Sequence, residues 1–405
     1  MDTRAAQHPL ADLFCFSHLR WDFVYQRPQH VMSRFARTRG VVFVEEAIVE
    51  AGVEPHLRCS DRAGGVRVVV PVLPEDQGDR DAIALQRGLL SDFVEQHGTP
   101  SPTFWFQTPM SLPVAPLDLA GAVVYDCMDE LGAFHGAPPA LAFNEKQLLS
   151  RADLVLTGGR ALYEAKRSKH PNVHCLPSAI DAAHFARARH HIHGATDCLT
   201  EVVDLPTGPR VGFAGVLDER LDIGLLADVA DLRPDHQFVM VGPIVKIDPA
   251  ELPRRANIHY LGLREYADLP DLMAEWDVAI MPFARNAATR FISPTKTPEY
   301  LAAGLPVVST GILDVVRTYG EPGLVAIADD AAAFAAAIDA AVGVKDDPTR
   351  LRAVTNALKD VSWDSIWSRM AALEQMAALE QRSLPEPPSA GPVGEGQREN
   401  AADVR

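Results

Sequence analysis

The sequence predicts an α/β protein with two consecutive domains, each built on a doubly wound parallel sheet. Two observations predict this fold. Short apolar runs of strand length alternate with amphipathic stretches from residue 12 to residue 382, and one turn-forming run, LPTGP at 205–209, divides the series in two. A chain of 405 residues is long enough for about two or three domains, so two domains are the economical description.

Each apolar run is short and continuous, as in strands that helices cover on both faces. In the first half these runs are 12–16, 41–45, 66–72, 104–106, 122–125 and 154–157. In the second half they are 210–214, 237–241, 258–261, 278–281, 306–309 and 324–327. Amphipathic stretches such as 28–37 and 80–97 lie between them, as expected for helices.

The domain boundaries follow from these runs. We expect a first domain over 1–205, a second over 206–360 and a last helix over 361–382, which carries Ile366, Met370 and Leu373 on one face. Residues 383–405 are rich in Pro, Gly and charge, and we expect them to be a disordered tail.

Composition excludes several classes of protein. With 38 Lys and Arg against 54 Asp and Glu, the net charge is 38 − 54 = −16, which argues against a nucleic-acid partner. Five cysteines without a CxxC pair are typical of free thiols in a reducing compartment. The N-terminus lacks the apolar core of a signal peptide, and no apolar run reaches membrane-spanning length. We therefore expect a cytoplasmic protein.

The run SPTKTPEYLAAGLPVVST at 293–310 predicts a helix that could receive a phosphate. Ser293 is a suitable N-cap and Pro294 fits the first helical position, where no N–H is needed. The free N–H groups of such a helix favour an anion, and Lys296 adds a positive charge. Glu299 lies more than a turn inside, where its carboxylate could accept hydrogen bonds from ribose hydroxyls. The alternative is an ordinary capped helix.

Polar residues follow most of the predicted strands. In parallel sheets ligands bind beyond the carboxyl ends of the strands, so these residues are candidates for a site. In the first half they are Ser17, His18, Glu45, Glu46, Gln107, Thr108, Asp126, Asp129, Gly158 and Gly159. In the second half they are the loop 212–215 with Arg220, then Gly242 with Pro243, then Gly262 with Leu263 and Arg264. Two such edges suit an enzyme that holds two substrates between its domains.

Several motifs resemble the retaining GT-B glycosyltransferases of family 4, or group 1. These motifs are PSAIDAAHF at 177–185, VGFAGVLDER at 211–220, FVMVGP at 238–243, NIHYLGLREYADLPDLMAEWDVAIMPF at 257–283 and PTKTPEYLAAGLPVVST at 294–310. The first half, with SHLRWDFVYQRPQHVMSRFA at 17–36 and YDCMDEL at 125–131, is similar to the teichuronic acid glycosyltransferases of bacteria.

The resemblance implies two Rossmann-like domains that face each other across a cleft, with a last helix crossing back to the first domain. It also implies a metal-independent, hexosyltransferase-type enzyme without a cofactor. The donor would be a nucleotide-diphosphate sugar, expected to be UDP-linked, and the acceptor a glycan or lipid-linked molecule of cell-surface polysaccharide synthesis.

The resemblance assigns donor-binding roles where the residues match. Glu299 corresponds to the second Glu of the family's Glu-x7-Glu element, which holds the ribose, whereas Phe291 stands where the first Glu normally contacts the sugar. Arg220 lies near the expected diphosphate-binding Arg. The expected donor-binding residues are Gly215, Arg220, Gly242, Leu263, Arg264, Ser293, Thr295, Lys296 and Glu299.

A general base, if one is used, should come from the first domain. Asp126 and Asp129 are the main candidates and His18 is a third, because imidazole titrates near neutrality. The alternatives are that Asp126 caps its loop, that Asp129 starts a helix and that His18 is structural. In a retaining mechanism the leaving phosphate could take the proton instead. The expected acceptor-side residues are Trp21, Arg27, Gln107 and His135.

Other features allow a structural and a functional interpretation. Trp21 could stack on an acceptor or pack locally. The cluster of Arg27, Arg34, Arg37 and Arg39 could contact an anionic membrane surface or form a solvated helix face. The histidines at 184, 190, 191 and 193 lack the spacing and partners of a zinc site, so we expect no metal. Two rival functions remain, a GT-B nucleotide-sugar epimerase and a non-catalytic GT-B partner protein.

Overall fold

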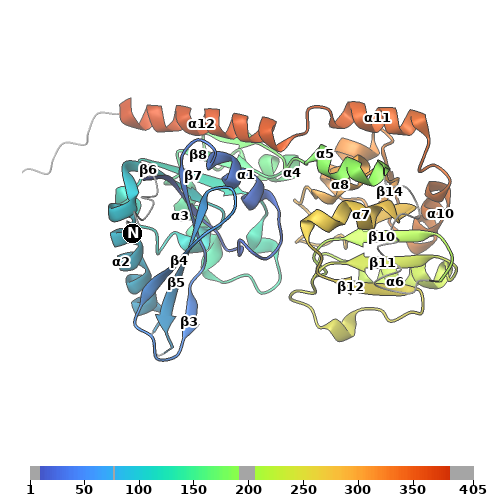
Figure 1. Cartoon of the computed structure of the whole chain (residues 1–405), viewed down its shortest axis with the longest axis horizontal. Coiled ribbons are helices and arrows are strands. Elements are labelled where there is room, and N and C mark those ends of the chain that lie inside the picture. Colours follow the sequence, from blue (N-terminus) through green and yellow to red (C-terminus); the bar gives the residue numbers. More distant parts are fainter. Residues whose placement is uncertain (1–9, 76–77, 191–205, 384–405) are drawn as a thin grey trace, which may run out of the picture.

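The computed structural model describes residues 10–75, 78–190 and 206–383, and the predicted tail at 384–405 lies outside them. Figure 1 shows two α/β domains side by side, with the long helix α12 (Trp363–Ser383) lying over the first domain and α11 (Pro348–Leu358) over the second. Within the described ranges, no helix is long and apolar enough to cross a bilayer.

The first domain is built on a twisted sheet with the order β3-β5-β2-β1-β6-β7-β8-β9, and β4 is added antiparallel to β5. The strands are β1 (Ala11–Phe16), β2 (Gly40–Val44), β3 (Ile48–Glu50), β4 (His56–Asp61), β5 (Val66–Pro74), β6 (Gly98–Phe106), β7 (Ala122–Cys127), β8 (Leu154–Thr157) and β9 (Val173–Cys175). The helices are α1 (Arg27–Phe35), α2 (Asp79–His97), α3 (Ala140–Leu149) and α4 (Arg160–Lys166). The strand order reverses between β1 and β6. In such sheets ligands bind beyond the carboxyl ends of the strands at the point of reversal.

The second domain has a wholly parallel sheet of order β12-β11-β10-β13-β14-β15. The strands are β10 (Arg210–Ala214), β11 (Gln237–Val241), β12 (Ile258–Gly262), β13 (Val278–Met281), β14 (Val307–Ser309) and β15 (Val325–Ile327). The helices are α5 (Ala182–Ala186), α6 (Ile223–Leu232), α7 (Leu269–Ala274), α8 (Lys296–Ala302), α9 (Leu313–Val315), α10 (Ala331–Val342) and α11. Here the order reverses between β10 and β13.

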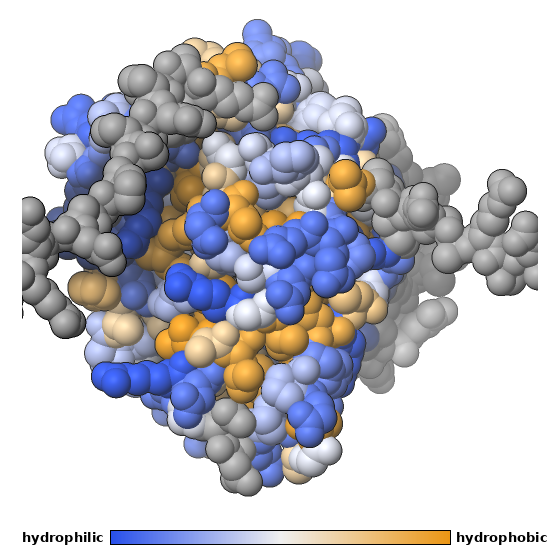
Figure 2. Space-filling view, turned by 90° about the vertical axis from the view of Figure 1, so that its left-hand side faces the viewer, coloured by the Kyte–Doolittle hydropathy of each residue, from blue (hydrophilic) through white to orange (hydrophobic). Residues whose placement is uncertain are grey.

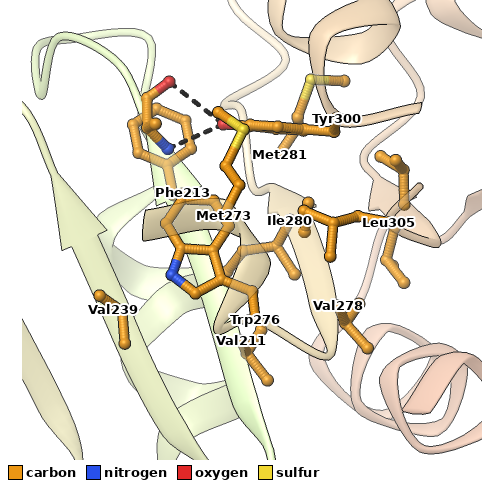
Figure 3. Close-up of a cluster of buried hydrophobic side chains, with 14 of the residues drawn as sticks. Val211, Phe213, Val239, Met273, Trp276, Val278, Ile280, Met281, Tyr300 and Leu305 are labelled. Carbon is orange, nitrogen blue, oxygen red and sulfur yellow. Dashed lines mark hydrogen bonds between the residues drawn. The ribbon is translucent and has the colours of Figure 1, made fainter. Parts of the chain in front are cut away.

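The core of the second domain is packed tightly around one tryptophan (Figure 3). Trp276 is fully buried, and a Cβ on Gly212 of β10 would come within 1.9 Å of its ring, so only glycine fits there. Tyr300 of α8 is also fully buried, and its hydroxyl group accepts from the Ala214 N–H at 2.8 Å and donates to the Ala214 carbonyl at 3.1 Å. These contacts join α8 to the carboxyl end of β10.

The chain crosses between the domains earlier than the boundary predicted at residue 205. Ile180 and Phe185 belong to the core of the second domain, and α5 packs against α7 and α8. The chain returns through α12, whose Trp363, Ile366 and Met370 lie in the core of the first domain.

The arginine cluster fastens α12 to the first domain. Arg34 and Arg37 both pair with Asp364, and Arg39 pairs with the buried Glu374 at 3.1 Å. Arg27 is buried and has a different partner, described below. The charges that could have met a membrane surface therefore have carboxylate partners within the chain.

The end of the first domain that lies away from the second domain carries apolar side chains and a cavity. Figure 2 looks onto this end and shows apolar side chains gathered near the middle of the face among charged ones. A cavity of about 620 Å³ opens at the amino ends of the strands, between residues 99–103 and Glu374 of α12. Because ligands of parallel sheets bind at the carboxyl ends, this cavity lies at the wrong edge for the predicted site.

We expect Met370→Ala to destabilise the first domain by about 2–5 kcal/mol, because Met370 is fully buried between α12 and the first domain and its truncation leaves a cavity. Urea unfolding followed by circular dichroism measures the change. Met376→Ala is the matched control on the same helix, since Met376 is 58% exposed and its loss should change stability by no more than about 0.5 kcal/mol. Equal effects of the two substitutions would contradict the packing of α12 described here.

Candidate functional site

The carboxyl edges of the two sheets lie against each other. The His135 N–H, in the loop after β7, donates to Glu219 in the loop after β10 at 2.9 and 3.1 Å. The Asp314 carboxylate, after β14, accepts from the Arg160 and Ala161 N–H groups of α4 at 2.8 and 3.0 Å. The loops at the carboxyl ends of the two sheets, where the sequence predicts the site residues, therefore lie in one region.

The helix that carries Glu299 begins later than predicted. The prediction of Ser293 as N-cap and Pro294 as first residue is wrong, since α8 begins at Lys296 with Thr295 as N-cap. Pro298 falls in its first turn, which tolerates proline because the first N–H groups have no partner within a helix. Both Pro294 and Pro298 fit this rule, so the position of a proline alone does not decide where the helix begins. Ser293 instead lies against the first domain, where a Cβ on Gly159 would be 2.7 Å from its Cβ.

Lys296 and Glu299 form a pair above a glycine loop. The Lys296 Nζ atom lies 3.6 Å from Glu299 Oε2, and a Cβ on Gly215 would be 2.9 Å from the Lys296 Cε atom. The stem of Lys296 therefore lies over the backbone of Gly215. Burial raises the pKa of Glu299, and Lys296 offsets part of that shift. This pair places a cation and a carboxylate side by side over the loop, as expected for residues that would contact a phosphate and hydroxyl groups.

The loops after β10, β11 and β12 are layered at close range. Gly242 has φ +141°, and a Cβ there would meet the Gly215 carbonyl oxygen at 1.9 Å, so a side chain is excluded. Its N–H donates to the Gly262 carbonyl at 2.8 Å. Beyond Gly262, Leu263 is exposed, and the buried Nε of Arg264 has no hydrogen-bond partner among the described residues. Open backbone and a free donor at this edge could contact a flat base.

Arg220 is held in place by its neighbour Asp218. Its Nε and Nη2 atoms donate to the Asp218 carboxylate at 2.9 and 2.7 Å. The guanidinium group also lies 5.8 Å from the centre of the Phe134 ring in the first domain. Arg220 therefore faces the first domain from the second, and its diphosphate-binding role stays a prediction.

Asp126 and Arg27 form a buried ion pair. Asp126 is fully buried on β7, and Arg27 donates to both of its oxygens, at 2.7 and 3.2 Å, and to the Leu176 carbonyl at 2.9 Å. Both oxygens of Asp126 are thus occupied, and Arg27 is not open to an acceptor. This geometry favours a structural role for both residues, as a buried ion pair rather than as a loop cap or part of a solvated helix face, and their predicted catalytic and acceptor roles stay predictions.

Trp21 is also placed for packing. It is 8% exposed, its ring lies edge-on to Phe43 with 5.0 Å between centres, and its backbone N–H donates to Glu45 at 2.8 Å. The structure therefore favours the packing interpretation of Trp21 over stacking on an acceptor.

Asp129 is the carboxylate best placed for acid–base chemistry. It is half-buried in the loop after β7. Burial raises its pKa above the ordinary value, and the nearby Arg220 and Arg27 reduce the shift only in part. A raised pKa brings a carboxylate closer to the proton affinity that a general base needs near neutral pH. Of the two predicted aspartates, Asp129 is the one that faces the second domain.

His18 and Gln107 present polar atoms without partners. The Nδ1 of His18 and both amide atoms of Gln107 are buried and have no hydrogen-bond partner among the described residues. Burial, together with the charge of Lys246, lowers the pKa of His18 to about 4, so its ring is neutral at pH 7. Buried polar groups without partners are rare in proteins, and here they gather at the carboxyl edge of the first sheet.

Phe291, which stands where the resemblance implies a sugar-binding Glu, joins the domains. It is half-buried, and it packs against the apolar core of the first domain. Arg290 lies over its ring at 5.2 Å. An apolar domain contact therefore replaces a carboxylate at this point.

Three residues of the interface were missed by sequence reasoning: Glu219, Lys246 and Asp314. Lys246 follows Gly242 and Pro243 after β11, and Asp314 follows β14 by five residues. All three lie a few residues beyond a strand end, so the strand-end rule would have found them only if it had been applied further into each loop.

Within the described ranges no group of residues could hold a metal, and His184 stacks on Tyr266 at 4.4 Å. The side chain of His190, together with residues 191 and 193, lies outside the description.

Several known proteins are similar to this chain in sequence or in fold. Residues 208–343 match the family model described as "Glycosyl transferases group 1". The second domain is a group 1 glycosyltransferase domain. Sucrose-phosphate synthase of Thermosynechococcus elongatus is 15% identical, with a TM-score of 0.68 over 91% of this chain and all of that one. A UDP-forming α,α-trehalose-phosphate synthase of Burkholderia xenovorans is 13% identical, with a TM-score of 0.66 over 91% of this chain and all of that one. The predicted GT-B fold is confirmed.

A curated relative extends the similarity into the first domain. The candidate teichuronic acid biosynthesis glycosyltransferase TuaH of Bacillus subtilis (strain 168) is 25% identical over an alignment of 271 positions that covers 61% of this chain. The GT-B chain spans 65% of that relative, just under two thirds of its length.

We expect Arg27→Met to cost about 3–5 kcal/mol of stability, because it leaves the Asp126 carboxylate buried without a partner. Urea unfolding measures the loss, and Asp126→Asn in the same background should recover part of it. Arg37→Met is the control, since its pair with Asp364 is more than half exposed and should contribute no more than about 1 kcal/mol. A loss below about 1 kcal/mol for Arg27→Met would leave Asp126 free for the catalytic role.

Proposed function

We propose that this GT-B protein is a hexosyltransferase that moves a sugar from a UDP-sugar to a glycan or lipid-linked acceptor in cell-surface polysaccharide synthesis. One observation carries the proposal: α8 holds Lys296 and Glu299 as a pair over the Gly215 loop, and Tyr300 anchors this helix to the same strand end. The group 1 domain supports the transferase class. The relative named for teichuronic acid biosynthesis supports the polysaccharide role, and the UDP-forming synthase supports UDP.

In this proposal the second domain binds the donor. Glu299 accepts hydrogen bonds from the ribose hydroxyls, and the open backbone at Gly262 together with Arg264 contacts the base. Lys296 and Arg220 stabilise the charge that develops on the diphosphate as the bond to the sugar breaks. These cations take the part that a metal plays in other transferases, so the proposal needs no metal.

The first domain binds the acceptor in this proposal. Asp129 takes the proton of the attacking hydroxyl group, since it faces the donor domain and has a raised pKa. His18 and Gln107 offer neutral hydrogen-bonding atoms to the acceptor or the sugar. If the reaction retains configuration, the leaving phosphate takes the proton instead and Asp129 only positions the acceptor.

We propose a cytoplasmic location, supported by the free thiols Cys15 and Cys127 in the cores. The peripheral membrane contact expected from the arginine cluster is not part of this proposal, because Arg27, Arg34, Arg37 and Arg39 have carboxylate partners.

Incubation of the full chain with UDP-sugars and envelope glycans tests the proposed function. A transferase releases UDP in proportion to glycosylated product. An epimerase would return a different UDP-sugar with little UDP, and a non-catalytic partner protein would give neither product.

We expect Glu299→Gln to weaken UDP binding by about 10- to 100-fold, because hydrogen bonds to a charged group contribute about 1.5–3 kcal/mol. Isothermal titration calorimetry with UDP measures the affinity. Glu321→Gln, at an exposed site after α9, is the control for the loss of one charge. Unchanged affinity in Glu299→Gln would rule out its contact with the ribose.

We expect Asp129→Asn to leave UDP affinity unchanged and to lower kcat by about 10²- to 10⁴-fold, the usual contribution of a general base. A base acts when deprotonated, so wild-type kcat should fall as the pH drops through the raised pKa of Asp129, which lies above 3.8. The variant should lack this acidic limb. Turnover within about twofold of wild type would assign the proton to the leaving phosphate.

A further inference from the structure

Lys246 has a strained backbone in a loop that is otherwise firmly held. It is the one non-glycine residue with positive φ, at +62°, in the described part of the chain. The Leu217 N–H donates to the Pro243 carbonyl at 2.9 Å, and the Val245 N–H donates to the Leu217 carbonyl at 3.0 Å. These bonds tie the loop after β11 to the loop that carries Arg220. A bulky residue in this conformation is unfavourable, and such strain is typical of functional sites.

The side chain of Lys246 extends from the donor domain to the first domain. Its Nζ lies 5.8 Å from the centre of the Phe134 ring in the loop after β7. Its charge contributes to the lowered pKa of His18, after β1, and opposes the rise that burial causes in the pKa of Glu46, after β2. Lys246 therefore faces three loops of the acceptor domain.

Lys246 differs in its partners from three other cations of the region. Arg220 is bound to Asp218, Lys296 to Glu299 and Arg20 to Glu45. The Lys246 ammonium has no hydrogen bond or ion pair with any described residue, and it faces the Phe134 ring at 5.8 Å. A cation that faces a ring rather than a carboxylate keeps its charge available for a ligand.

The groups across from Lys246 need a polar ligand. His18 Nδ1 and the amide of Gln107 are buried without partners at the same edge of the first sheet. Neutral hydrogen-bonding atoms on one side and a free cation on the other suit a hydroxylated molecule that carries an anionic group. An ammonium group binds a carboxylate or a phosphate through charge-assisted hydrogen bonds, which are stronger than neutral ones.

We propose that Lys246 binds an anionic group of the acceptor, a carboxylate or a phosphate, and so selects acidic acceptors from the donor side. This inference rests on the proposed function, because only a transferase makes the bound molecule an acceptor. Its geometric part, a site for acidic sugars between Lys246 and the His18 edge, can be tested alone.

Calorimetric titrations of the full chain with glucuronate, glucose 6-phosphate and glucose, each with and without saturating UDP, test the proposal. We expect wild type to bind one or both acidic sugars at least about tenfold more tightly than glucose. The two acidic probes distinguish a carboxylate site from a phosphate site. Lys246→Gln should bring the ratio of affinities close to one and leave UDP affinity within twofold, while Lys359→Gln, at an exposed helix end, should change neither.

Lys246→Gly separates the functional role from a structural one. Glycine relieves the strain at positive φ, so this variant should melt at a higher temperature and still lose the preference for acidic sugars. A wild-type protein without that preference, or a Lys246→Gln variant that keeps it, would overturn the proposal. A tenfold loss of UDP affinity in Lys246→Gln would also overturn it, because Lys246 would then serve the donor diphosphate. A wild type that binds no UDP would refute the proposed function, and the titrations without UDP would still decide the role of Lys246.

Discussion

The buried hydroxyl group of Tyr300 is the contact on which the donor side depends. It bonds to both backbone groups of Ala214 inside a core packed around Trp276, whose ring centre lies 6.2 Å from that of Tyr300 (Figure 3). Helix α8 has seven residues, too few to be stable alone, so its position comes from tertiary contacts. Glu299 precedes Tyr300 directly, and Lys296 lies one turn before. The core therefore fixes the backbone of Glu299 and Lys296 beside the Gly215 loop, and only the side chains of these two residues can still move.

Several contacts between the domains are polar. Asp314 supplies the carboxylate that caps α4, whose own N-cap, Gly159, has no side chain to do so. Arg317 pairs with Glu164 at 3.0 Å, and Glu219 receives the His135 N–H. Such contacts exchange with water at a small free-energy cost, so they can hold two domains in register and still release them. A site that lies between two sheets must open to admit its substrates, and this interface is suited to that.

The sequence predicted the parts of the fold that depend on local pattern. Buried parallel strands are continuous apolar runs and were all found, whereas β3 and β9 have three residues each and β4 is largely exposed, so they left no apolar signal. Polar residues at strand ends were also found, but their partners were not. Arg27 and Asp126 are 99 positions apart, and only the fold shows that they neutralise each other. Burial of Trp21 and exposure of Lys246 depend in the same way on packing between distant segments.

The pairing of Lys296 with Glu299 bears on how the proposed donor site would recognise its ligand. A phosphate that attracts Lys296 removes a partner from a carboxylate that is only 12% exposed. An unpaired buried carboxylate is costly, so Glu299 then requires new hydrogen-bond donors. The ribose hydroxyls of a nucleotide supply them, and inorganic pyrophosphate does not. In the proposed site, recognition of the phosphate and of the ribose would therefore be coupled through this one pair, and the site would favour a complete nucleoside diphosphate over its fragments.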